Sequence, residues 1–211
     1  MPSPRSRRAL IAQCSVSVSA LAAGCLGDDV VSDGGTSTDP TTADGPSIAE
    51  SFDCENASRP EPDVAGGVER ELTVDGETRT ETSVGSVDYP SAPDPSDDDA
   101  VVAYAAAHEE AYRRNDLAAD NGEDLVGYGF SSRGSELVDR RDGVAFVRVE
   151  YVYYANVVRE NAVVHADSPI YAATYAVSDW GVARAVGGTA DADGGLDPHP
   201  VEDGTLVACF E

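Results

Sequence analysis

The sequence predicts an α+β domain in which one main helix packs on a curved antiparallel sheet of about four to six strands. Apolar residues recur at three and four spacing over residues 98–117, which is the period of one helix face. Beyond Asn121-Gly122 the apolar residues alternate with period two, in segments separated by short turns. A helix followed by hairpin-linked strands is typical of the α+β class, with an antiparallel sheet.

The helix at residues 98–117 has recognisable ends. Ser96 and the aspartates that follow it supply a cap and negative charge at the N-terminus, and two arginines lie near the other end. One apolar stripe is expected to contain Val101, Tyr104, Ala105, His108, Ala111 and Tyr112. Glu109, Glu110 and Arg113 are predicted to lie off this stripe.

One strand is expected before the helix, at residues 68–74, followed by a Thr/Gly/Asp-rich loop to residue 97. After the helix, strands are expected at 125–130, 136–139, 144–158, 162–166, 170–177, 182–186 and 205–210. Asp142-Gly143 predicts a hairpin turn. We expect the helix to cover the tyrosine-rich face, as in cystatin-like sheets, an analogy of fold that carries no function.

Residues 144–158 form the strongest predicted strand. Its odd-numbered positions from Ala145 to Ala155 make a wholly apolar face, while Arg148 and Glu150 mark the opposite face as partly solvated. The sheet is rich in tyrosine: Tyr128, Tyr151, Tyr153, Tyr154, Tyr171 and Tyr175. Tyrosines of this kind either line a ligand groove or form cross-strand core pairs. Tyr154 stands apart, because its parity places it on the solvated face.

The first 25 residues have a different composition from the rest. Residues 1–8 carry three arginines and no acid, and residues 9–24 carry no charge and are rich in Ala, Ser, Val and Leu. This is the order of the positive and apolar regions of an export signal. The uncharged run, about sixteen residues, is shorter than the roughly 20 residues of a membrane-spanning helix, so export is favoured over a span.

Ser6-Arg7-Arg8-Ala9-Leu10-Ile11 resembles a twin-arginine export signal, and Leu21-Ala22-Ala23-Gly24-Cys25 resembles a lipobox. Lipidation requires a thiol, and the peptidase requires small residues directly before it; Cys25 and its two predecessors fit both needs. Ala22 departs from the pattern, since a larger aliphatic residue is more usual there. The alternative is a plain leader cleaved near Ala23, with Cys25 incidental.

The formal net charge is -25, the sequence pI is near 4.1, and none of the 211 residues is lysine. Without the leader, 11 arginines face 39 acidic residues, a formal charge near -28. Such a charge destabilises the compact state through self-repulsion, which concentrated salt screens. It argues against nucleic acid or an anionic membrane surface as a partner. The 41% hydrophobic content argues against a disordered acidic chain.

This composition, together with the leader and lipobox, resembles that of twin-arginine-exported lipoproteins of extremely halophilic archaea. The resemblance implies location and solvent only. It predicts a signal peptide at residues 1–24, an acidic Gly/Ser/Thr linker at 25–50 carrying lipidated Cys25, and one extracytoplasmic domain at 51–211. Core residues reappear near Ile48 or Phe52.

Cys54 and Cys209 are the two cysteines that remain after the leader, one near each end of the domain. Because thiols oxidise outside the cell, we predict a disulfide between them. The alternatives are two unpaired buried thiols or, less favoured, metal binding by two distant cysteines. Asn56-Ala57-Ser58 is an N-glycosylation sequon, which makes Asn56 a candidate site for a glycan.

No catalytic motif is present, and we expect a binding or envelope-interaction protein anchored to the extracytoplasmic face of the cell membrane, without a cofactor. Its partner is an unknown protein or small molecule. The alternative is a small extracytoplasmic hydrolase or isomerase in which His108 and Tyr104 form an acid/base pair within a cavity. A core imidazole hydrogen-bonded to a tyrosine or a backbone carbonyl is the simpler interpretation of His108.

Asp191, Asp193 and Asp197 alternate near glycines, like the opening of a calcium loop. The segment lacks the third ligand before the glycine and the terminal glutamate of the full motif. We therefore expect a solvated acidic loop and predict no metal site.

Overall fold

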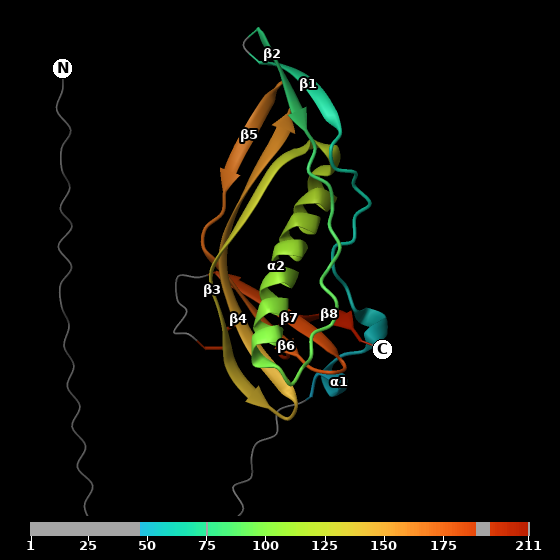
Figure 1. Ribbon diagram of the computed structural model, residues 1–211, viewed down its shortest axis with the longest axis vertical. Helices are drawn as coiled ribbons and strands as arrows, with labels where there is room; N and C mark the ends of the chain where they lie inside the picture. The colour runs from blue at the N-terminus through green and yellow to red at the C-terminus, as the bar shows by residue number, and fades with distance from the viewer. Residues whose placement is uncertain (1–46, 75, 189–194, 211) are drawn as a thin grey trace, which may run out of the picture. The chain divides into compact units, whose positions relative to one another are not determined.

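The computed structural model describes residues 47–74, 76–188 and 195–210. One long helix, α2, packs on a six-stranded antiparallel sheet, which confirms the predicted α+β class (Figure 1). The elements are α1 (Ile48–Ser51), η1 (Cys54–Asn56), β1 (Glu69–Val74), β2 (Glu77–Thr82), α2 (Asp98–Asn121), η2 (Gly122–Asp124), β3 (Leu125–Arg141), β4 (Val144–Arg159), β5 (Ala162–Asp167), β6 (Tyr171–Val177), β7 (Gly181–Gly188) and β8 (Thr205–Cys209).

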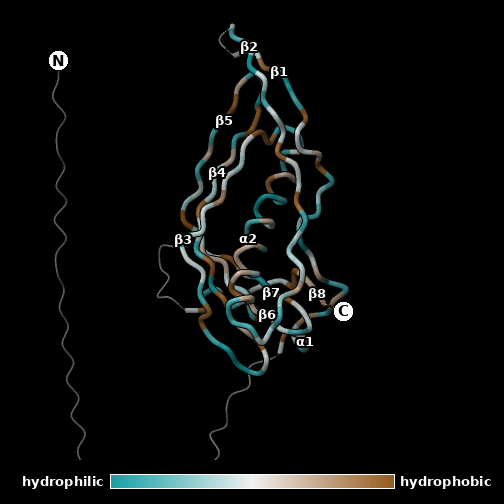
Figure 2. Tube along the Cα trace, in the orientation of Figure 1, coloured by the Kyte–Doolittle hydropathy of each residue, from teal (hydrophilic) through white to brown (hydrophobic). Residues whose placement is uncertain are grey.

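The strands of the main sheet follow the order β3-β4-β6-β7-β8, and β5 pairs with the far end of β4. Two-residue turns join β3 to β4 and β4 to β5, and Asp142, Gly143 and Glu160 in these turns all have positive φ. The predicted hairpin at Asp142-Gly143 is confirmed. β1 and β2 form a separate two-stranded hairpin, much of it hydrophilic (Figure 2).

The helix begins where the sequence predicts and ends later. Asp97 is the N-cap, its side chain accepting a hydrogen bond from the Ala100 amide, and Asp98 and Asp99 lie in the first turn. The helix continues to Asn121, past the predicted end at residue 117, and Gly122 ends it with positive φ.

Two strand predictions differ from the structure. β3 is one strand of 17 residues where two short strands were predicted, and three register shifts interrupt its pairing with β4. β2 occupies a region that was predicted as loop, because Glu77–Thr82 (ETRTET) has no apolar alternation and is largely exposed. In both cases pairing with a neighbouring strand overrides a weak local pattern.

Side chains from α2 and the odd-numbered positions of β4 fill the core on one face of the sheet. Val101, Tyr104, Val147, Tyr151 and Tyr175 are buried members of it. A second core lies on the other face, where Ile48 of α1 packs with Phe146, Ala183, Val201 and Leu206. Ile48 is buried, so folded residues precede the predicted domain boundary at residue 51.

The second core changes the environment of Arg148, which was predicted to lie on a partly solvated face of β4. Arg148 is buried; its guanidinium pairs with Glu150 and donates to the Gly195 carbonyl. Glu150 remains partly exposed, as predicted. The sequence pattern of β4 does not indicate that the segment 195–204 packs on the face of the sheet that carries Arg148.

The predicted disulfide is present between Cys54 of η1 and Cys209 of β8. The two Cα atoms are 5.8 Å apart, within the ordinary range for a disulfide. A backbone hydrogen bond from Ser58 to Leu206 lies beside it. The bond therefore joins the start of the domain to the strand that ends it.

Residues 59–66 and 83–89, which we call the strap, run beside α2 without regular secondary structure (Figure 1). Arg114 and Asn115 of α2 bind the strap through the Gly85 carbonyl and both backbone groups of Val87. Gly66 and Gly85 are in backbone contact, and a Cβ on Gly85 would lie 2.4 Å from the Gly66 nitrogen. Only glycine permits this approach.

Candidate functional site

His108 was the sequence-predicted catalytic candidate, and the structure encloses it completely. Its side chain has no exposed surface. Its ring contacts those of Tyr89, Tyr104, Tyr112 and Tyr175, with centroids 4.8, 5.6, 6.4 and 5.6 Å away. Nδ1 lies 3.2 Å from the Tyr175 hydroxyl. This is the hydrogen-bonded core imidazole of the simpler interpretation.

The ionisation of His108 and Tyr104 does not suit proton transfer near neutral pH. Burial lowers the pKa of His108 to about 3 and raises the pKa of Tyr104 to about 12. An acid/base pair works best when its pKa values lie near the working pH. Of the buried side-chain polar atoms in the described residues, only Tyr104 Oη and His108 Nε2 lack a hydrogen-bond partner. Catalysis would require solvent or substrate to reach these two atoms, but four tyrosine rings surround His108.

Glu109, which was predicted off the apolar stripe, is in fact fully buried and is the centre of a charged network. Arg184 of β7 donates to both of its oxygens, at 2.7 and 2.8 Å, and the Tyr175 hydroxyl donates at 2.6 Å. Burial would raise the pKa of Glu109, but Arg184 and Arg113 outweigh it and lower the pKa to about 2. The carboxylate is therefore an anion with its hydration shell replaced by protein donors.

Arg113 extends this network toward the tyrosines of the sheet. Its Nε donates to Glu109 at 3.1 Å and to the Tyr151 hydroxyl at 2.7 Å. Its guanidinium lies 5.5 Å from the centroid of the Tyr171 ring. The Glu109 carboxylate, the two guanidinium groups and the two tyrosine hydroxyls are all hydrogen-bonded to one another. The network is therefore best understood as a structural element that holds α2 on β4, β6 and β7.

The remaining sequence candidates differ in position. Cys25, Asp191 and Asp193 lie outside the described residues, and Asp197 is exposed. Asn56 is exposed at the end of η1. Among the residues that the structure describes, no three His, Cys, Asp or Glu side chains are grouped closely enough to hold a metal ion.

An open groove lies where β3, β4 and the end of β5 meet, and we call it the aromatic groove. Its volume is about 330 Å³. Gly129, Phe130, Ser131, Val152, Tyr153, Tyr154, Asp167 and Ser168 line it. One of these eight residues is acidic and none is basic. The side chains of Tyr154 and Asp167 lie on the face of the sheet away from α2, whereas the rings of Phe130 and Tyr153 stack on buried Tyr151 on the α2 face. Mostly apolar linings with a few polar groups are typical of small-molecule sites.

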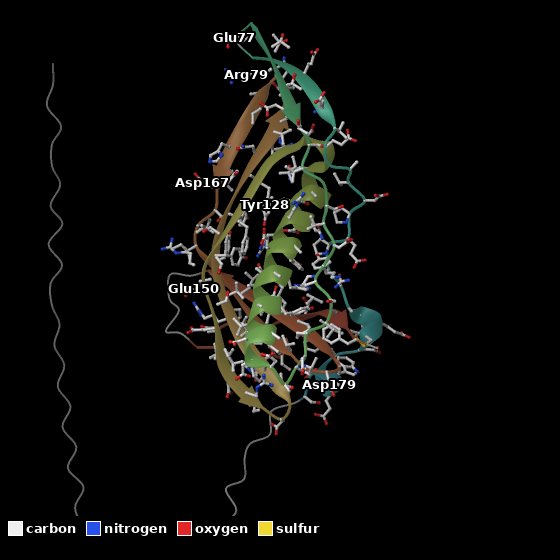
Figure 3. The ribbon with its side chains drawn as sticks, viewed as in Figure 1. Glu77, Arg79, Tyr128, Glu150, Asp167 and Asp179 are labelled. Carbon is white, nitrogen blue, oxygen red and sulfur yellow. A yellow bond between two sulfur atoms is a disulfide. The ribbon has the colours of Figure 1, made fainter. Side chains whose placement is uncertain are left out.

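Tyr154 is the most exposed tyrosine side chain of this groove, at 40%. Its position on the open face, predicted from strand parity, is confirmed. Tyr151 and Tyr175 are fully buried core residues, and Tyr128 reaches α2, donating to the Glu110 carbonyl (Figure 3). Tyr153 packs with Tyr151 and Tyr171 against the same core, so Tyr154 is the sheet tyrosine whose ring lies on the open face.

Small residues on β3 leave room for Tyr154. A Cβ on Gly129 would lie 2.2 Å from Tyr154 Cε1, and one on Gly127 would lie 2.5 Å from the Asn156 amide nitrogen. Tyr154 and Asn156 thus lie against the backbone of their cross-strand partners on β3. Any larger residue at Gly129 would push the tyrosine ring out of this position.

Polar side chains from β4 and β5 border the groove. Asp167 pairs with Tyr154 in the strand register, and His165 pairs with Asn156. The ring nitrogens of His165 face Asn156 Oδ1 at 2.6 Å and Asp167 Oδ1 at 3.2 Å. The Asp167 side chain is 77% exposed, and it lies with Glu150 on the side of the sheet away from α2 (Figure 3).

Sequence reasoning missed Asn156 and Asp167, although a signal for them exists. A two-residue turn at Glu160-Asn161 pairs Arg159 with Ala162, and counting back along the strands pairs Asn156 with His165 and Tyr154 with Asp167. The register of the hairpin therefore assembles the polar border of the groove.

A second cavity, of about 610 Å³, lies along the strap and is more polar. Arg59, Glu61, Asp88, Tyr89 and Asn115 are among its lining residues. These groups largely satisfy one another: Arg59 pairs with Glu61 and stacks on Tyr89, whose hydroxyl donates to the Pro60 carbonyl. The aromatic groove, by contrast, presents an exposed ring and an exposed carboxylate.

No protein-family model matches the chain, and no curated protein or solved structure is significantly similar to it. None of the described helices has the length and apolar character needed to cross a bilayer.

Proposed function

We propose that this chain is a lipid-anchored binding protein of the extracytoplasmic membrane face, and that the aromatic groove is its binding site. The observation that carries the binding role is the exposed side chain of Tyr154, on the part of β4 that pairs with both β3 and β5. Val163 and Val164 of β5 and Ile170, which follows β5, are exposed apolar residues on the segment whose Asp167 and Ser168 line the groove. Clustered exposed apolar residues commonly mark an interaction site.

Three features support the proposed location. The twin-arginine and lipobox motifs at residues 6–25 predict export and attachment through Cys25. The Cys54–Cys209 disulfide suits an oxidising compartment outside the cytoplasm. The excess of acidic residues over arginine suits a solvent of high ionic strength, as in the halophilic archaea that the composition resembles.

The anchor is tested by membrane fractionation of cells that express the full chain. The wild-type protein is expected in the membrane fraction, and Cys25→Ser is expected in the soluble extracytoplasmic fraction, because the serine hydroxyl does not take the lipid. Cys14→Ser is the matched control and should remain on the membrane. Membrane attachment of Cys25→Ser equal to that of the wild type would contradict the lipid anchor.

The binding role is tested by placing a photo-crosslinking amino acid at Ser131, in the groove, and at Ser135, further along β3. Illumination of intact cells is expected to give adducts from position 131, detected by mass spectrometry of the purified protein. Position 135, which is half-buried, is the control for contacts made elsewhere on the same strand. Equal adduct yields at the two positions, or none at position 131, would remove the groove as the binding site.

A further inference from the structure

We propose that the free edge of β5 joins two copies of this chain by antiparallel strand pairing, an inference that goes beyond the proposed binding role and does not depend on what the groove binds. β5 pairs with β4 on one side. Among the described residues, no strand pairs with its other side (Figure 1). The edge of such a strand presents unpaired N–H and C=O groups, to which a strand of another chain can be added.

The surface around this edge is apolar and uncovered. All six residues of β5 are exposed, and Val163 and Val164 are 37% and 48% exposed. Six large apolar side chains are exposed in the described residues, and four of them lie within residues 154–170. A concentration of exposed apolar surface on one hairpin is typical of an interaction site.

The register of the β4–β5 hairpin determines which backbone groups of β5 are free. The Ser168 amide donates to the Tyr153 carbonyl, and the same register continues through β5 without a shift. Hydrogen-bonded and non-hydrogen-bonded pairs alternate along an antiparallel ladder, so even-numbered residues of β5 direct their backbone groups at β4. The backbone groups of Val163, His165 and Asp167 therefore point toward the free edge.

The two ends of the main sheet are protected in ways that β5 is not. β3, at one end, has three register shifts in its pairing and carries exposed charged residues such as Arg133. β8, at the other end, is tied to the start of the domain through the disulfide of Cys209. Bulges, charged side chains and covering segments are the usual protection of a sheet edge. β5 pairs without a shift, and it contains one acidic residue, Asp167, and no arginine.

The same alternation limits how two copies can pair. Free backbone groups must meet free backbone groups, so odd-numbered residues lie opposite odd-numbered residues and even opposite even. One such register pairs residues 163–167 of the two copies and places His165 opposite the partner's His165. The other pairs residues 162–166, with Val164 opposite the partner's Val164 on the twofold axis and Val163 opposite the partner's His165.

Side-chain chemistry and charge favour the register centred on Val164, and a second copy as the occupant of the edge. This register pairs valine with valine and Ala162 with the partner's Ala166. Asp167 lies opposite the partner's Asn161, so no carboxylate faces a carboxylate along the paired strands. This matters in a chain with a net charge of -25, because two copies repel wherever their acidic surfaces meet. A contact of one strand is small, so we expect a reversible dimer.

Disulfide crosslinking in membranes from cells that express the full chain tests this pairing. In Val164→Cys the two new thiols lie opposite each other in a non-hydrogen-bonded pair, with Cα atoms about 4.5 Å apart, within reach of a disulfide. Oxidation with copper phenanthroline is therefore expected to give a covalent dimer on non-reducing gels. Val163→Cys is the matched control, because its two thiols lie on a diagonal of about 7–8 Å and should give little dimer. Val68→Cys controls for an exposed valine elsewhere.

A proline tests the backbone pairing itself. Val163→Pro removes an N–H that points toward the free edge and leaves the pairing of β5 with β4 intact. In the Val164→Cys background it is expected to weaken dimer formation about tenfold, since each copy loses one hydrogen bond to the other. Val163→Thr keeps the N–H and the branched shape and should crosslink like its parent. Circular dichroism confirms that each variant is folded.

Equal dimer yields from Val164→Cys and Val163→Cys, or no dimer from Val164→Cys, would overturn the proposed pairing. A crosslink from Val164→Cys to a different protein would show that the second copy is the wrong occupant. Undiminished crosslinking in the proline variant would contradict pairing through the backbone. None of these results bears on photo-crosslinking at position 131, which tests the groove separately.

Discussion

A carboxylate without water contact is stable as an anion only when cations and hydrogen-bond donors replace its hydration shell. Glu109 meets this condition through Arg184, Arg113 and the Tyr175 hydroxyl. The arrangement joins α2 to β6 and β7 at one point. Removing the carboxylate would leave two arginines in a core without their counter-charge.

We therefore predict that Glu109→Gln lowers the free energy of unfolding by about 3–5 kcal/mol, the usual cost of breaking a buried ion pair. Glu110→Gln is the matched control, because Glu110 is the next residue of the helix and is exposed. Its effect is expected within about 0.5 kcal/mol. Chemical denaturation in concentrated KCl measures both. Equal effects of the two substitutions would show that the network contributes little.

We predict that the burial of His108 makes the folded domain less stable in acid. Burial lowers its pKa from 6.5 to about 3, so below pH 6.5 the unfolded chain binds a proton that the folded chain excludes. Its contribution to stability is complete above pH 6.5 and is lost as the pH falls toward 3, on the order of 3 kcal/mol by pH 4. The pKa of Glu109, near 2, adds a further loss below pH 4.5 in the same direction.

Comparing the pH dependence of unfolding in the wild type and in His108→Gln isolates the histidine. The wild type is expected to lose more stability between pH 6.5 and pH 4, because glutamine does not titrate. The two curves should run parallel above pH 7, where both side chains are neutral. Parallel curves over the whole range would mean that His108 is not excluded from protonation in the folded protein.

Among the elements, β3 combines a structural and a functional requirement. Its small residues opposite β4 allow Tyr154 and Asn156 to lie against the backbone, and the register shifts let the long strand change direction along the sheet. Tyr154 and Asn156 can take these positions because β3 has no side chain at Gly129 and Gly127. The same strand offers a glycine without this role, Gly134, near which a Cβ would meet no atom within 4 Å.

We predict that Gly129→Ala displaces the Tyr154 ring, and that Gly134→Ala leaves it in place. The far end of a tyrosine moves easily, so Gly129→Ala should lower the free energy of unfolding by only about 1 kcal/mol. The ring resonances of Tyr154 in NMR spectra report its displacement. Unchanged Tyr154 resonances in Gly129→Ala would show that the ring does not depend on the space above this glycine.

The elements that were predicted correctly are those whose apolar periodicity can be read within the element's own residues. α2 and β4 each repeat apolar residues at the period of their own structure over several turns or residue pairs. Glu109 was assigned wrongly because Arg184, its partner, is 75 residues away, and helical periodicity contains no information on a distant counter-charge. Likewise, β2 and the burial of Arg148 depend on chain segments that meet only in the folded domain. The open face of Tyr154 was predicted correctly because the alternation of side chains along one strand is a local property. The groove beside it could not be predicted, because it depends on the registers of the β3–β4 and β4–β5 hairpins.

For the whole molecule, charge dominates the dependence on solvent. The arginines of the domain are few against its acids, and several of them, such as Arg184 and Arg148, are buried in ion pairs. The acidic surface is therefore left with little compensation, and repulsion opposes the compact state at low ionic strength.

The melting temperature is predicted to rise steeply with KCl up to about 1 M, where the Debye length falls to roughly 3 Å, and more slowly beyond it. Thermal unfolding followed by circular dichroism measures this dependence. Sucrose at equal osmolarity is the control, since it does not screen charge. A melting temperature that is flat or falling with KCl would contradict the role assigned to surface repulsion.

The disulfide acts on the same scale, because it closes a loop with a sequence separation of 155. Replacing both cysteines by serine is predicted to lower the free energy of unfolding by about 5 kcal/mol, through the larger entropy of the open unfolded chain. Denaturation of the Cys54→Ser/Cys209→Ser variant against the oxidised wild type measures the difference. The reduced wild type should behave like the variant; a wild type insensitive to reduction would contradict the prediction.

The same bond also determines how the domain carries mechanical load. In a protein anchored through Cys25, as we propose, a ligand that pulls on the aromatic groove applies tension between that groove and Ser47. Because Cys54 is bonded to Cys209, the force passes from the tether into β8 and then across β7 and β6 to β4. The strap, which covers His108, lies outside this path. The anchor can therefore be under tension without peeling the strap from α2.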